Sequence, residues 1–367
     1  MGAVTLSICI PTFNFGAFIG ETLESIFRQS LAGVEIIVLD SASTDNTAAV
    51  IDAFATRFSN LRYIRADKRE GIDRDLARVV AEAAGRYVWL FSADDVMRPN
   101  AVAHAVQAFP TGADVLLCSH SNCDKGMRYL WDHPVMAARA GDMFDLGDIA
   151  QRHEYFGRAI TTEAFFSFMS GMIVKAETWR SVPLNEKFVG SCWAHVARLF
   201  ELIKERGLKV CYIGGPLLDK RGDNDSFAGD GVVARWRLGI VGMTEIAADI
   251  FGKGSVEAMH VNRVLQNEFP SLSLLALHRV TRSAGRHDEL PRLDELAHVL
   301  YAPGIPGSWA KRFAYRVHAR IPAPILVAAV KLLEWTGAKN VLKRMLRSRI
   351  LPDEPAFRSQ DALKALE

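Results

Sequence analysis

Two adjacent carboxylates, Asp94 and Asp95, directly follow the hydrophobic run "RYVWLF". Ionised side chains are rarely left at the end of a buried strand unless they are paired or bind a ligand. Hard oxygen ligands suit Mg²⁺ or Mn²⁺, and such an ion neutralises phosphate groups and acts as a Lewis acid. The pair is therefore a candidate metal site. The alternative for Asp95 is the cap of a helix over "VMRPNAVAHAV".

Two other hydrophobic runs also end in polar residues. "SICIPTFN" ends in the turn Pro11-Thr12-Phe13, and "VEIIVLD" ends at Asp40. A carboxylate at a strand end can accept hydrogen bonds from the N–H groups of a ligand. The alternative is that Asp40 and Ser43 only cap the helix that follows. Both turns are candidate ligand contacts.

The segments that must position these residues alternate in character. Four β-rich runs, "TLSICIPTF", "VEIIVLD", "LRYIRA" and "RYVWLF", are separated by segments with apolar residues at helical spacing. This order predicts an α/β fold with a doubly wound, mostly parallel, Rossmann-like sheet. Ligands of such sheets bind at the carboxyl ends of the strands. The three polar clusters should therefore meet at one edge.

The second half of the chain has a less regular pattern. "DVLLCSH" and "LKVCYIGGPLLDK" indicate strands, "FFSFMSGMIVKAETW" a strand leading into a helix, and "SCWAHVARLFELIKERG" a helix that ends at Gly207. Residues 120–160 are expected to be irregular, and 232–300 mainly helical. We therefore expect boundaries near residues 115, 230 and 304.

Composition and charge argue against several classes of protein, including disulfide-rich, secreted and membrane-spanning ones. The chain has 367 residues, 49% hydrophobic and 23% charged, with a net charge of +2, as in an ordinary globular protein. Five scattered cysteines without metal spacing indicate reduced thiols. No signal peptide is expected, and "APILVAAV" is too short to span a bilayer. Ile305–Ile350 contains ten Lys or Arg residues and one acid, which predicts an anionic partner.

The motif "SICIPTFN…IIVLDSASTDNT…GIDRDLA…AAGRYVWLFSADD", within residues 5–110, resembles the nucleotide-sugar domain of family 2 glycosyltransferases, which have the GT-A fold. "FSFMSGMIVKAETW", "FVGSCWAHV" and "RGDNDSF" resemble the abequosyltransferase subgroup, which attaches a dideoxyhexose during O-antigen assembly. The resemblance implies a nucleotide-sugar-binding half (1–115), an acceptor-binding half (116–230), a helical region (231–304) and a basic amphipathic segment (305–367).

The resemblance also implies donor contacts. Asp40 would bind the nucleotide base, and Asp73 and Arg74, at a helix start, would face the base or the diphosphate. The family motif is Asp-x-Asp, which implies that Asp94 is the main metal ligand, and Ser92 replaces the first Asp of the motif. The predicted metal site therefore has one carboxylate fewer than the family motif provides. The full set of expected donor contacts is Pro11, Thr12, Phe13, Asp40, Asp73, Arg74, Ser92, Ala93, Asp94 and Arg221.

"RGDNDSF" occupies the place of a loop that closes over the diphosphate in the family. Arg221 would clamp phosphate, and Asp223 would supply the metal ligand that Ser92 lacks. The alternative for Asn224, Asp225 and Ser226 is an ordinary turn.

The acceptor hydroxyl needs a proton acceptor. Family members carry Glu-Asp where this chain has Ser191-Cys192, so His195, one turn further, is the candidate catalytic base. The alternative is that His195 is a core or acceptor-orienting residue, and Glu163 is a second candidate base. Asp95 is expected to act beside the metal or to hydrogen-bond the sugar.

These expectations describe a metal-dependent glycosyltransferase that moves a sugar, with a deoxyhexose as one candidate, from a nucleotide diphosphate to a lipid-linked oligosaccharide in O-antigen or polysaccharide assembly. It would be cytoplasmic and peripheral at the cytoplasmic face of the inner membrane, bound to anionic lipid through the basic tract. That tract is equally compatible with a solvated helical bundle or a partner subunit, including a homo-oligomer. Nucleic-acid binding is not expected. The alternative function is a catalytically silent sugar-nucleotide-binding scaffold. A nucleotidyltransferase is disfavoured, because its Gly-rich, Lys-bearing N-terminal loop is absent.

Overall fold

The computed structural model describes residues 4–224, 231–302 and 308–320. A ten-stranded mixed sheet in the order β3-β2-β1-β4-β9-β6-β10-β5 forms its centre, with β7 paired to β6 and β8 to β10. The strands are β1 (Leu6–Thr12), β2 (Val34–Asp40), β3 (Leu61–Arg65), β4 (Tyr87–Leu90), β5 (Val96–Met97), β6 (Val115–Cys123), β7 (Tyr129–Asp132), β8 (Met143–Asp145), β9 (Met172–Lys175) and β10 (Lys209–Arg221).

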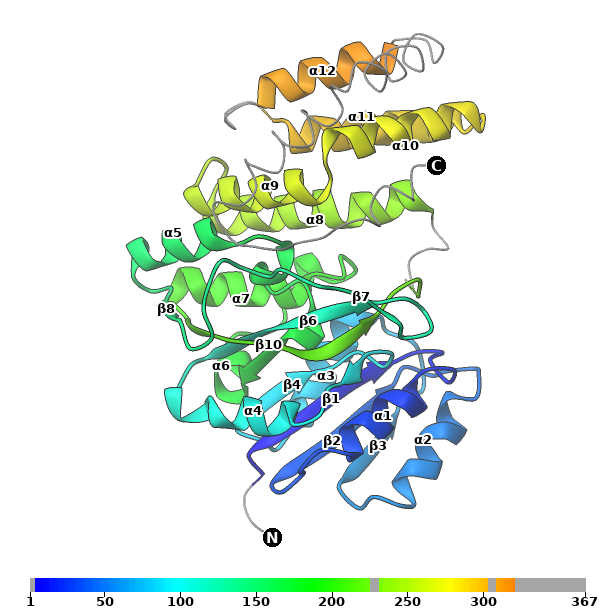
Figure 1. The fold of residues 1–367 in the computed structure, drawn as a ribbon, viewed down its shortest axis with the longest axis vertical. Helices are drawn as coiled ribbons and strands as arrows, with labels where there is room; N and C mark the ends of the chain where they lie inside the picture. The colour runs from blue at the N-terminus through cyan, green and yellow to red at the C-terminus, as the bar shows by residue number, and fades with distance from the viewer. Residues whose placement is uncertain (1–3, 225–230, 303–307, 321–367) are drawn as a thin grey trace.

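Helices cover both faces of the sheet and extend beyond it (Figure 1). They are α1 (Ile19–Phe27), α2 (Thr47–Ala55), α3 (Ile72–Ala81), α4 (Ala101–Gln107), α5 (Ile149–Arg158), α6 (Ala176–Arg180), α7 (Ala194–Glu205), α8 (Val232–Phe251), α9 (Val256–Glu268), α10 (Ser271–Ser283), α11 (Leu290–Leu300) and α12 (Ser308–Arg320).

Alternating side chains of the central strands divide the core in two. Ile8 and Ile10 of β1 pack in the cluster that contains the buried residues of α1 and α4. Cys9 packs on the opposite face, in the cluster that contains α3 and α7. Since successive side chains of a strand point to opposite faces, the burial of every residue of β1 requires cover on both sides. The predicted doubly wound α/β fold is confirmed.

The sheet is mixed, with parallel pairs on both sides of the antiparallel strand β9. β3, β2, β1 and β4 are parallel neighbours, whereas β9 pairs antiparallel with both β4 and β6. Because β9 reverses direction between two strands, β6 again runs parallel to β4. The carboxyl ends of β1, β2, β4 and β6 therefore lie at one edge, where the site is found.

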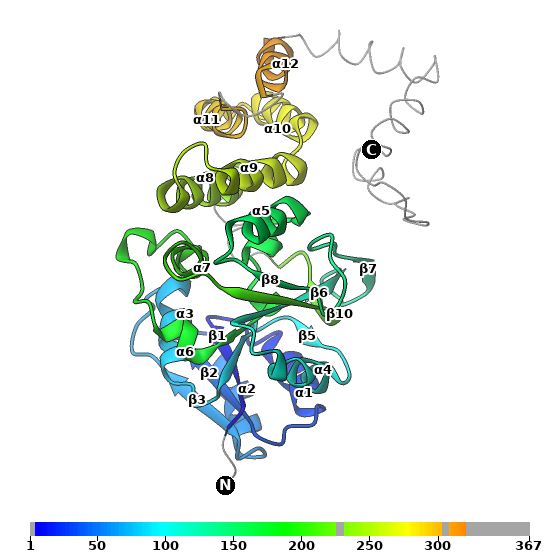
Figure 2. The same cartoon turned by 90° about the vertical axis from the view of Figure 1, so that its left-hand side faces the viewer.

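The C-terminal helices form a stack on one end of the sheet domain. α8 packs against α7, α9 and α11, and α10 packs against α11 and α12. Figures 1 and 2 show these helices in successive layers that lead away from the sheet. The predicted C-terminal helical extension is confirmed. The proposed boundaries within the sheet stay predictions, since the sheet is continuous from β1 to β10.

One local prediction was wrong, and one alternative is excluded. Residues 120–160 are more regular than expected, because they contain β7, β8 and α5, and the Asp148 carboxylate caps α5 by accepting from Gln151 N at 2.9 Å. Asp95 does not cap the next helix, because α4 begins at Ala101 behind Asn100. The short strand β5 lies between them, paired with β10. The Asp95 carboxylate is thus available for other contacts.

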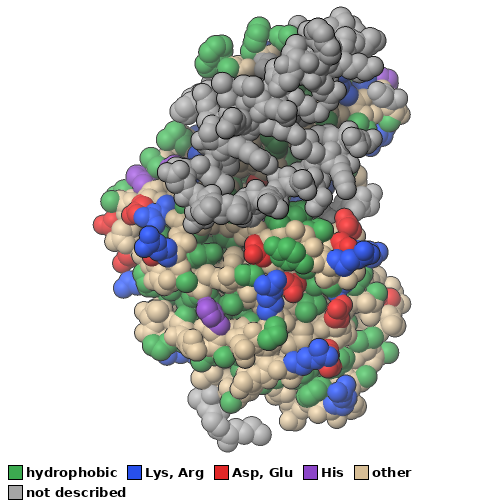
Figure 3. Space-filling model, viewed as in Figure 1, with side chains coloured by type: hydrophobic (Ala, Val, Ile, Leu, Met, Phe, Trp, Pro, Cys, Tyr) green, Lys and Arg blue, Asp and Glu red, His purple; other side chains and the backbone are tan. Residues whose placement is uncertain are grey.

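The surface gives a mixed charge pattern. On the described part of the face in Figure 3, acidic and basic side chains lie among one another, with hydrophobic side chains between them. Among the helices of the described residues, none is both long and apolar enough to cross a membrane. Most of the predicted basic segment 305–367 lies outside the described residues, and only α12 of this segment is described.

Candidate active site

The ends of β1 and β2 bring Thr12 and Asp40 together. The two residues are direct neighbours in the parallel register, and both are buried. The Asp40 carboxylate accepts from Ser43 N and from the Tyr63 hydroxyl, each at 2.8 Å. A carboxylate has about four acceptor positions, so Asp40 can still accept from a ligand. Thr12 Oγ1 is buried without a hydrogen-bond partner, which fits the predicted nucleotide contact.

The loop after β1 is held against the loop after β2. Ser43 Oγ accepts from Asn14 N at 2.8 Å, and Asp45 accepts from Gly16 N at 3.0 Å. The Arg69 guanidinium lies 4.2 Å from the centre of the Phe13 ring. These contacts fix the turn Pro11-Thr12-Phe13 beside Asp40, so Ser43 and Asp45 join two loops rather than only capping a helix.

Asp94 is surrounded by other oxygen-bearing side chains. One carboxylate oxygen accepts from the Ser92 hydroxyl, and the other accepts from the Asn224 amide at 2.8 Å. Ala93 between them is buried. Carboxylate, hydroxyl and amide oxygens are hard ligands, so this donor set fits Mg²⁺ or Mn²⁺. The replacement of the first motif Asp by Ser92 leaves the hydroxyl in contact with Asp94.

Asp95 points to the interior instead. It is 2% exposed and accepts from Ser170 Oγ at 2.7 Å and from Arg221 N at 3.2 Å. Burial, together with the charge of Asp94, raises the pKa of Asp95 to about 7. The side chain thus ties the acidic loop to β10 and to the segment before β9. Ser170 carried no signal in the sequence, because its partner is 75 residues away.

Arg221, at the end of β10, joins three parts of the chain. Its guanidinium donates to the Asp94 carbonyl at 3.0 Å, to the Lys125 carbonyl at 2.6 Å and to the Glu21 carboxylate. The side chain is nearly fully buried. A phosphate contact, as predicted, would require Arg221 to exchange one of these partners. In this structure Arg221 positions the acidic loop.

The loop after β10 reaches Asp94 through Asn224 rather than Asp223. Asp223 is exposed and has a left-handed backbone, with φ of 54°. Its predicted role as a metal ligand stays a prediction. Asp225 and Ser226 lie outside the described residues.

Asp73 and Arg74 diverge at the start of α3. The buried Asp73 carboxylate accepts from the backbone amides of Gly190, Cys192 and Ala194 at 2.8–3.0 Å. Arg74 forms an ion pair with Glu186 at 2.6 Å. Both side chains therefore join α3 to the segment before α7, and their predicted ligand contacts stay predictions.

His195 lies in the first turn of α7 and is 6% exposed. Neither ring nitrogen has a hydrogen-bond partner. Burial lowers the pKa of His195 to about 4, although the charge of Asp73 acts in the opposite direction. The imidazole is therefore neutral at pH 7. A base must contact the acceptor hydroxyl, and the burial of His195 limits such contact; its catalytic role stays a prediction.

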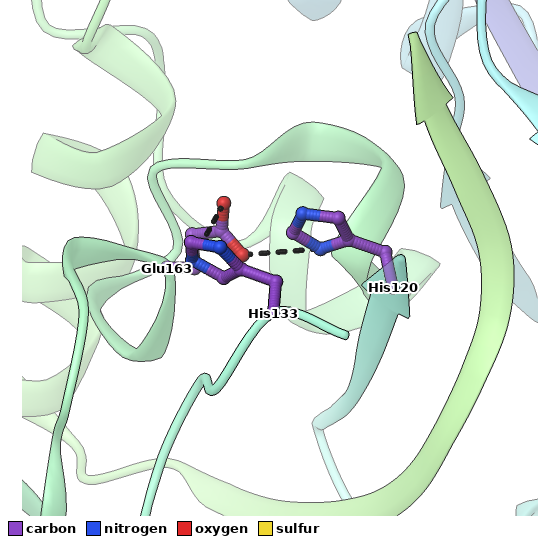
Figure 4. Close-up of side chains that lie close together, drawn as sticks. All are labelled: His120, His133 and Glu163. Atoms are coloured by element: carbon purple, nitrogen blue, oxygen red, sulfur yellow. Dashed lines mark ion pairs between the residues drawn. The ribbon is translucent and has the colours of Figure 1, made fainter. Parts of the chain in front are cut away.

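A second polar cluster lies at the same edge of the sheet. His120 of β6, His133 after β7 and Glu163 of the 3₁₀ helix Thr162–Phe165 converge (Figure 4). Burial raises the pKa of Glu163 to about 8 and lowers those of His120 and His133 to about 2 and about 4. The sequence reasoning singled out Glu163 but not the histidines. Their spacing of 13 positions has no helical or strand period, and only the β6–β7 pairing brings them together.

The fold and the arrangement of the site define a class of protein. Residues 7–174 match the family model "Glycosyl transferase family 2". Residues 1–349 of TarS from S. aureus, solved in complex with UDP-GlcNAc, superpose with a TM-score of 0.57 over 86% of this chain and 90% of that chain, at 15% identity. The chain has the GT-A fold, and its similarity to the family 2 glycosyltransferases covers residues 7–174, somewhat less than half of its 367 residues.

Sequence comparison gives a narrower relation. The chain is 29% identical to the abequosyltransferase RfbV of Salmonella typhimurium over 272 residues, which cover 73% of this chain and 81% of the relative. The glycosyltransferase GlyG of Streptococcus pneumoniae is 27% identical over 121 residues, or 33% of this chain and 40% of the relative. The predicted similarity to abequosyltransferases is therefore confirmed, and it extends beyond the family domain.

Proposed function

We propose that this glycosyltransferase transfers a sugar, with a deoxyhexose as the leading candidate, from a nucleotide-diphosphate donor to a lipid-linked oligosaccharide acceptor. One observation carries the proposal: Asp94, with Ser92 and Asn224 at its two carboxylate oxygens, lies at the same sheet edge as Thr12 and Asp40. The similarity to an abequosyltransferase over most of both chains supports the class of sugar.

Within this proposal, different residues along the sheet edge bind the nucleotide and the cation. Thr12 and Asp40 bind the nucleotide, since one offers a buried hydroxyl without a partner and the other a carboxylate with spare acceptor positions. Asp94 holds a divalent cation, with Asp223 as a further predicted ligand. When bound, this cation offsets the charge of the departing diphosphate. Asp95 and Arg221 keep the acidic loop in place.

In this proposal the C-terminal half contacts the acceptor and the membrane. On α12, Trp309, Phe313 and Val317 are spaced by four residues and are 78%, 66% and 41% exposed. Residues spaced by four lie on one face of a helix. Lys311, Arg312 and Arg316 lie on the same helix. An exposed aromatic stripe with basic neighbours suits the surface of an anionic membrane, where a lipid-linked acceptor is found.

Nucleotide binding and donor hydrolysis by the purified protein test this function. A thermal-shift screen of nucleotides and nucleotide sugars, with and without Mn²⁺, should show stabilisation by the true donor that grows with its concentration as RT ln(1 + [L]/Kd). Asp94→Ala should lose the Mn²⁺-dependent part of the shift and all sugar transfer. Asp67→Ala is the matched control, because Asp67 is exposed after β3.

Two results would contradict the proposal. Near-normal Mn²⁺-dependent turnover of Asp94→Ala would show that the donor site does not lie at this edge. Donor binding without any hydrolysis or transfer, even with acceptor added, would instead support a silent sugar-nucleotide-binding scaffold.

A further inference from the structure

His120, His133 and Glu163 form a compact cluster outside the acidic loop. One candidate ligand atom from each residue lies within 4.8 Å of the other two. Each side chain comes from a different element, and Figure 4 shows the Glu163 carboxylate directed toward both imidazoles. His120 is fully buried, and the side chains of Glu163 and His133 are 9% and 20% exposed. The cluster is therefore enclosed but still reached by solvent at His133.

The three side chains approach one another without satisfying one another. Glu163 Oε2 lies 3.2 Å from His120 Nδ1, and Glu163 Oε1 lies 3.4 Å from His133 Nε2. Despite these distances, neither ring nitrogen of His120 nor Glu163 Oε2 has a hydrogen-bond partner of good geometry, although the Asn122 side chain acts on His120. A buried polar atom without a partner costs about 1–3 kcal/mol. Buried polar atoms left without a well-aligned partner call for a further one, such as a water molecule or an ion.

Neighbouring residues hold both imidazoles in place. The rings of His120 and His133 stack at 4.6 Å with an interplanar angle of 17°, and the Phe168 ring lies 4.6 Å from that of His120. His133 Nδ1 contacts the Asn122 amide at 3.0 Å. Metal-binding histidines usually have their second ring nitrogen held by a hydrogen bond, which orients the ring. Asn122 would supply this contact with its amide oxygen turned toward Nδ1, since its NH₂ group faces Nδ1 in this structure.

The charged groups around the cluster do not exclude a cation. Lys220 Nζ lies 3.7 Å from Glu163 Oε1, and its side chain is 38% exposed, so it can turn toward solvent. The carboxylates of Asp95 and Glu268 also act on Glu163. Two further carboxylates thus act on Glu163, against the single ammonium group of Lys220, which acts on Glu163 and on both histidines.

We propose that His120, His133 and Glu163 bind a divalent transition-metal ion of the zinc class, in a site separate from Asp94. Imidazole nitrogen favours zinc-class ions, whereas the oxygen-only set at Asp94 favours Mg²⁺ or Mn²⁺. Three protein ligands leave a coordination position for water or a substrate oxygen, as in zinc sites that are not purely structural. The inference stands on this geometry and does not depend on the proposed function.

Zn²⁺ binding to the full chain tests the proposal. The protein is stripped with a chelator, and Zn²⁺ alone is titrated by calorimetry, with metal content measured after gel filtration. We expect one Zn²⁺ per chain. Glu163→Gln and His133→Ala should each weaken binding by at least about tenfold. His153→Ala is the matched control, since His153 also lies beside a glutamate, Glu257, but at 3.7 Å on the surface.

The Asp94→Ala variant separates this proposal from the proposed function. It should keep the Zn²⁺ while losing the Mn²⁺-dependent stabilisation by the donor. Circular dichroism and thermal unfolding of Glu163→Gln, which preserves the shape of the side chain, establish that the fold is intact. Unchanged Zn²⁺ affinity in folded Glu163→Gln and His133→Ala, or no Zn²⁺ bound by the unsubstituted protein, would overturn the proposal.

Discussion

The Asp73 carboxylate, in the first turn of α3, accepts a hydrogen bond of 3.0 Å from the backbone amide of Ala194, the first residue of α7. It also accepts from Gly190 and Cys192. The first amides of a helix have no partner within that helix, so a carboxylate at this position satisfies them and favours the helix dipole. One side chain thus fixes the segment Gly190–Ala194 against the donor half of the sheet.

Removal of this carboxylate should destabilise the protein. Asp73→Ala leaves buried amides without a partner, and we expect the free energy of unfolding to fall by about 3 kcal/mol. Urea unfolding followed by circular dichroism measures the change. The exposed Asp67, changed to Ala, should alter stability by less than about 0.5 kcal/mol. Equal stability of the two variants would mean that Asp73 has no such role.

The Asn224 contact with Asp94 leads to a prediction about metal affinity. Asn224→Ala removes the group that orients the Asp94 carboxylate, so the Mn²⁺ concentration for half-maximal activity should rise about tenfold. Asp223→Ala should raise it further, as expected for loss of a metal ligand. A Mn²⁺ titration of donor hydrolysis compares them. If Asp223→Ala matched the unsubstituted protein, Asp223 would not be a metal ligand.

The burial of His195 predicts a defined pH dependence of stability. Its pKa is about 4 in the folded protein, against an ordinary value of 6.5. Between these pH values the unfolded chain binds a proton at His195 that the folded protein does not bind. The contribution of His195 to the free energy of unfolding is therefore fully present above pH 6.5 and is lost as the pH falls toward 4. The loss amounts to about 1.4 kcal/mol per pH unit at most.

Comparison with a variant isolates this contribution. In His195→Asn the slope of the unfolding free energy against pH, between pH 6.5 and 4, should be smaller by up to the slope that one bound proton produces. The other buried groups, among them His133 and Glu163, still titrate in both proteins, so only the difference between the two curves is informative. Identical slopes would show that His195 is accessible to protons in the folded state.

The exposed stripe on α12 leads to a membrane-binding prediction. Trp309→Ser with Phe313→Ser should weaken binding to phosphatidylglycerol vesicles by at least about tenfold, because each aromatic side chain contributes more than ~1 kcal/mol on apolar burial. Vesicle co-sedimentation measures this. Tyr129→Ser is the control, since Tyr129 is 59% exposed on β7. Equal binding of all variants, or equal binding to uncharged phosphatidylcholine vesicles, would remove α12 from the membrane contact.

The fold class and the donor edge could be predicted from the sequence. Strand and helix periodicity are local properties, and the rule that ligands bind at the carboxyl ends of parallel strands turns chain order into spatial order. Thr12, Asp40 and Asp94 were predicted to meet for this reason, and they lie at one edge in the structure. The similarity to family 2 glycosyltransferases was likewise visible in short motifs.

Tertiary contacts decided what each polar side chain does. Arg221, Asp73 and Asp95 were expected to face a ligand. Each is instead buried and hydrogen-bonded to a segment far away in the sequence. Asp73 accepts from Gly190 N, Asp95 accepts from Ser170 and Arg221 N, and Arg221 donates to the Asp94 carbonyl. A strand pairing between distant segments likewise assembled His120, His133 and Glu163. A sequence pattern reports the residue type and the local backbone. The partner of a buried charge depends on which distant segments the sheet brings beside it, and local periodicity does not encode that choice.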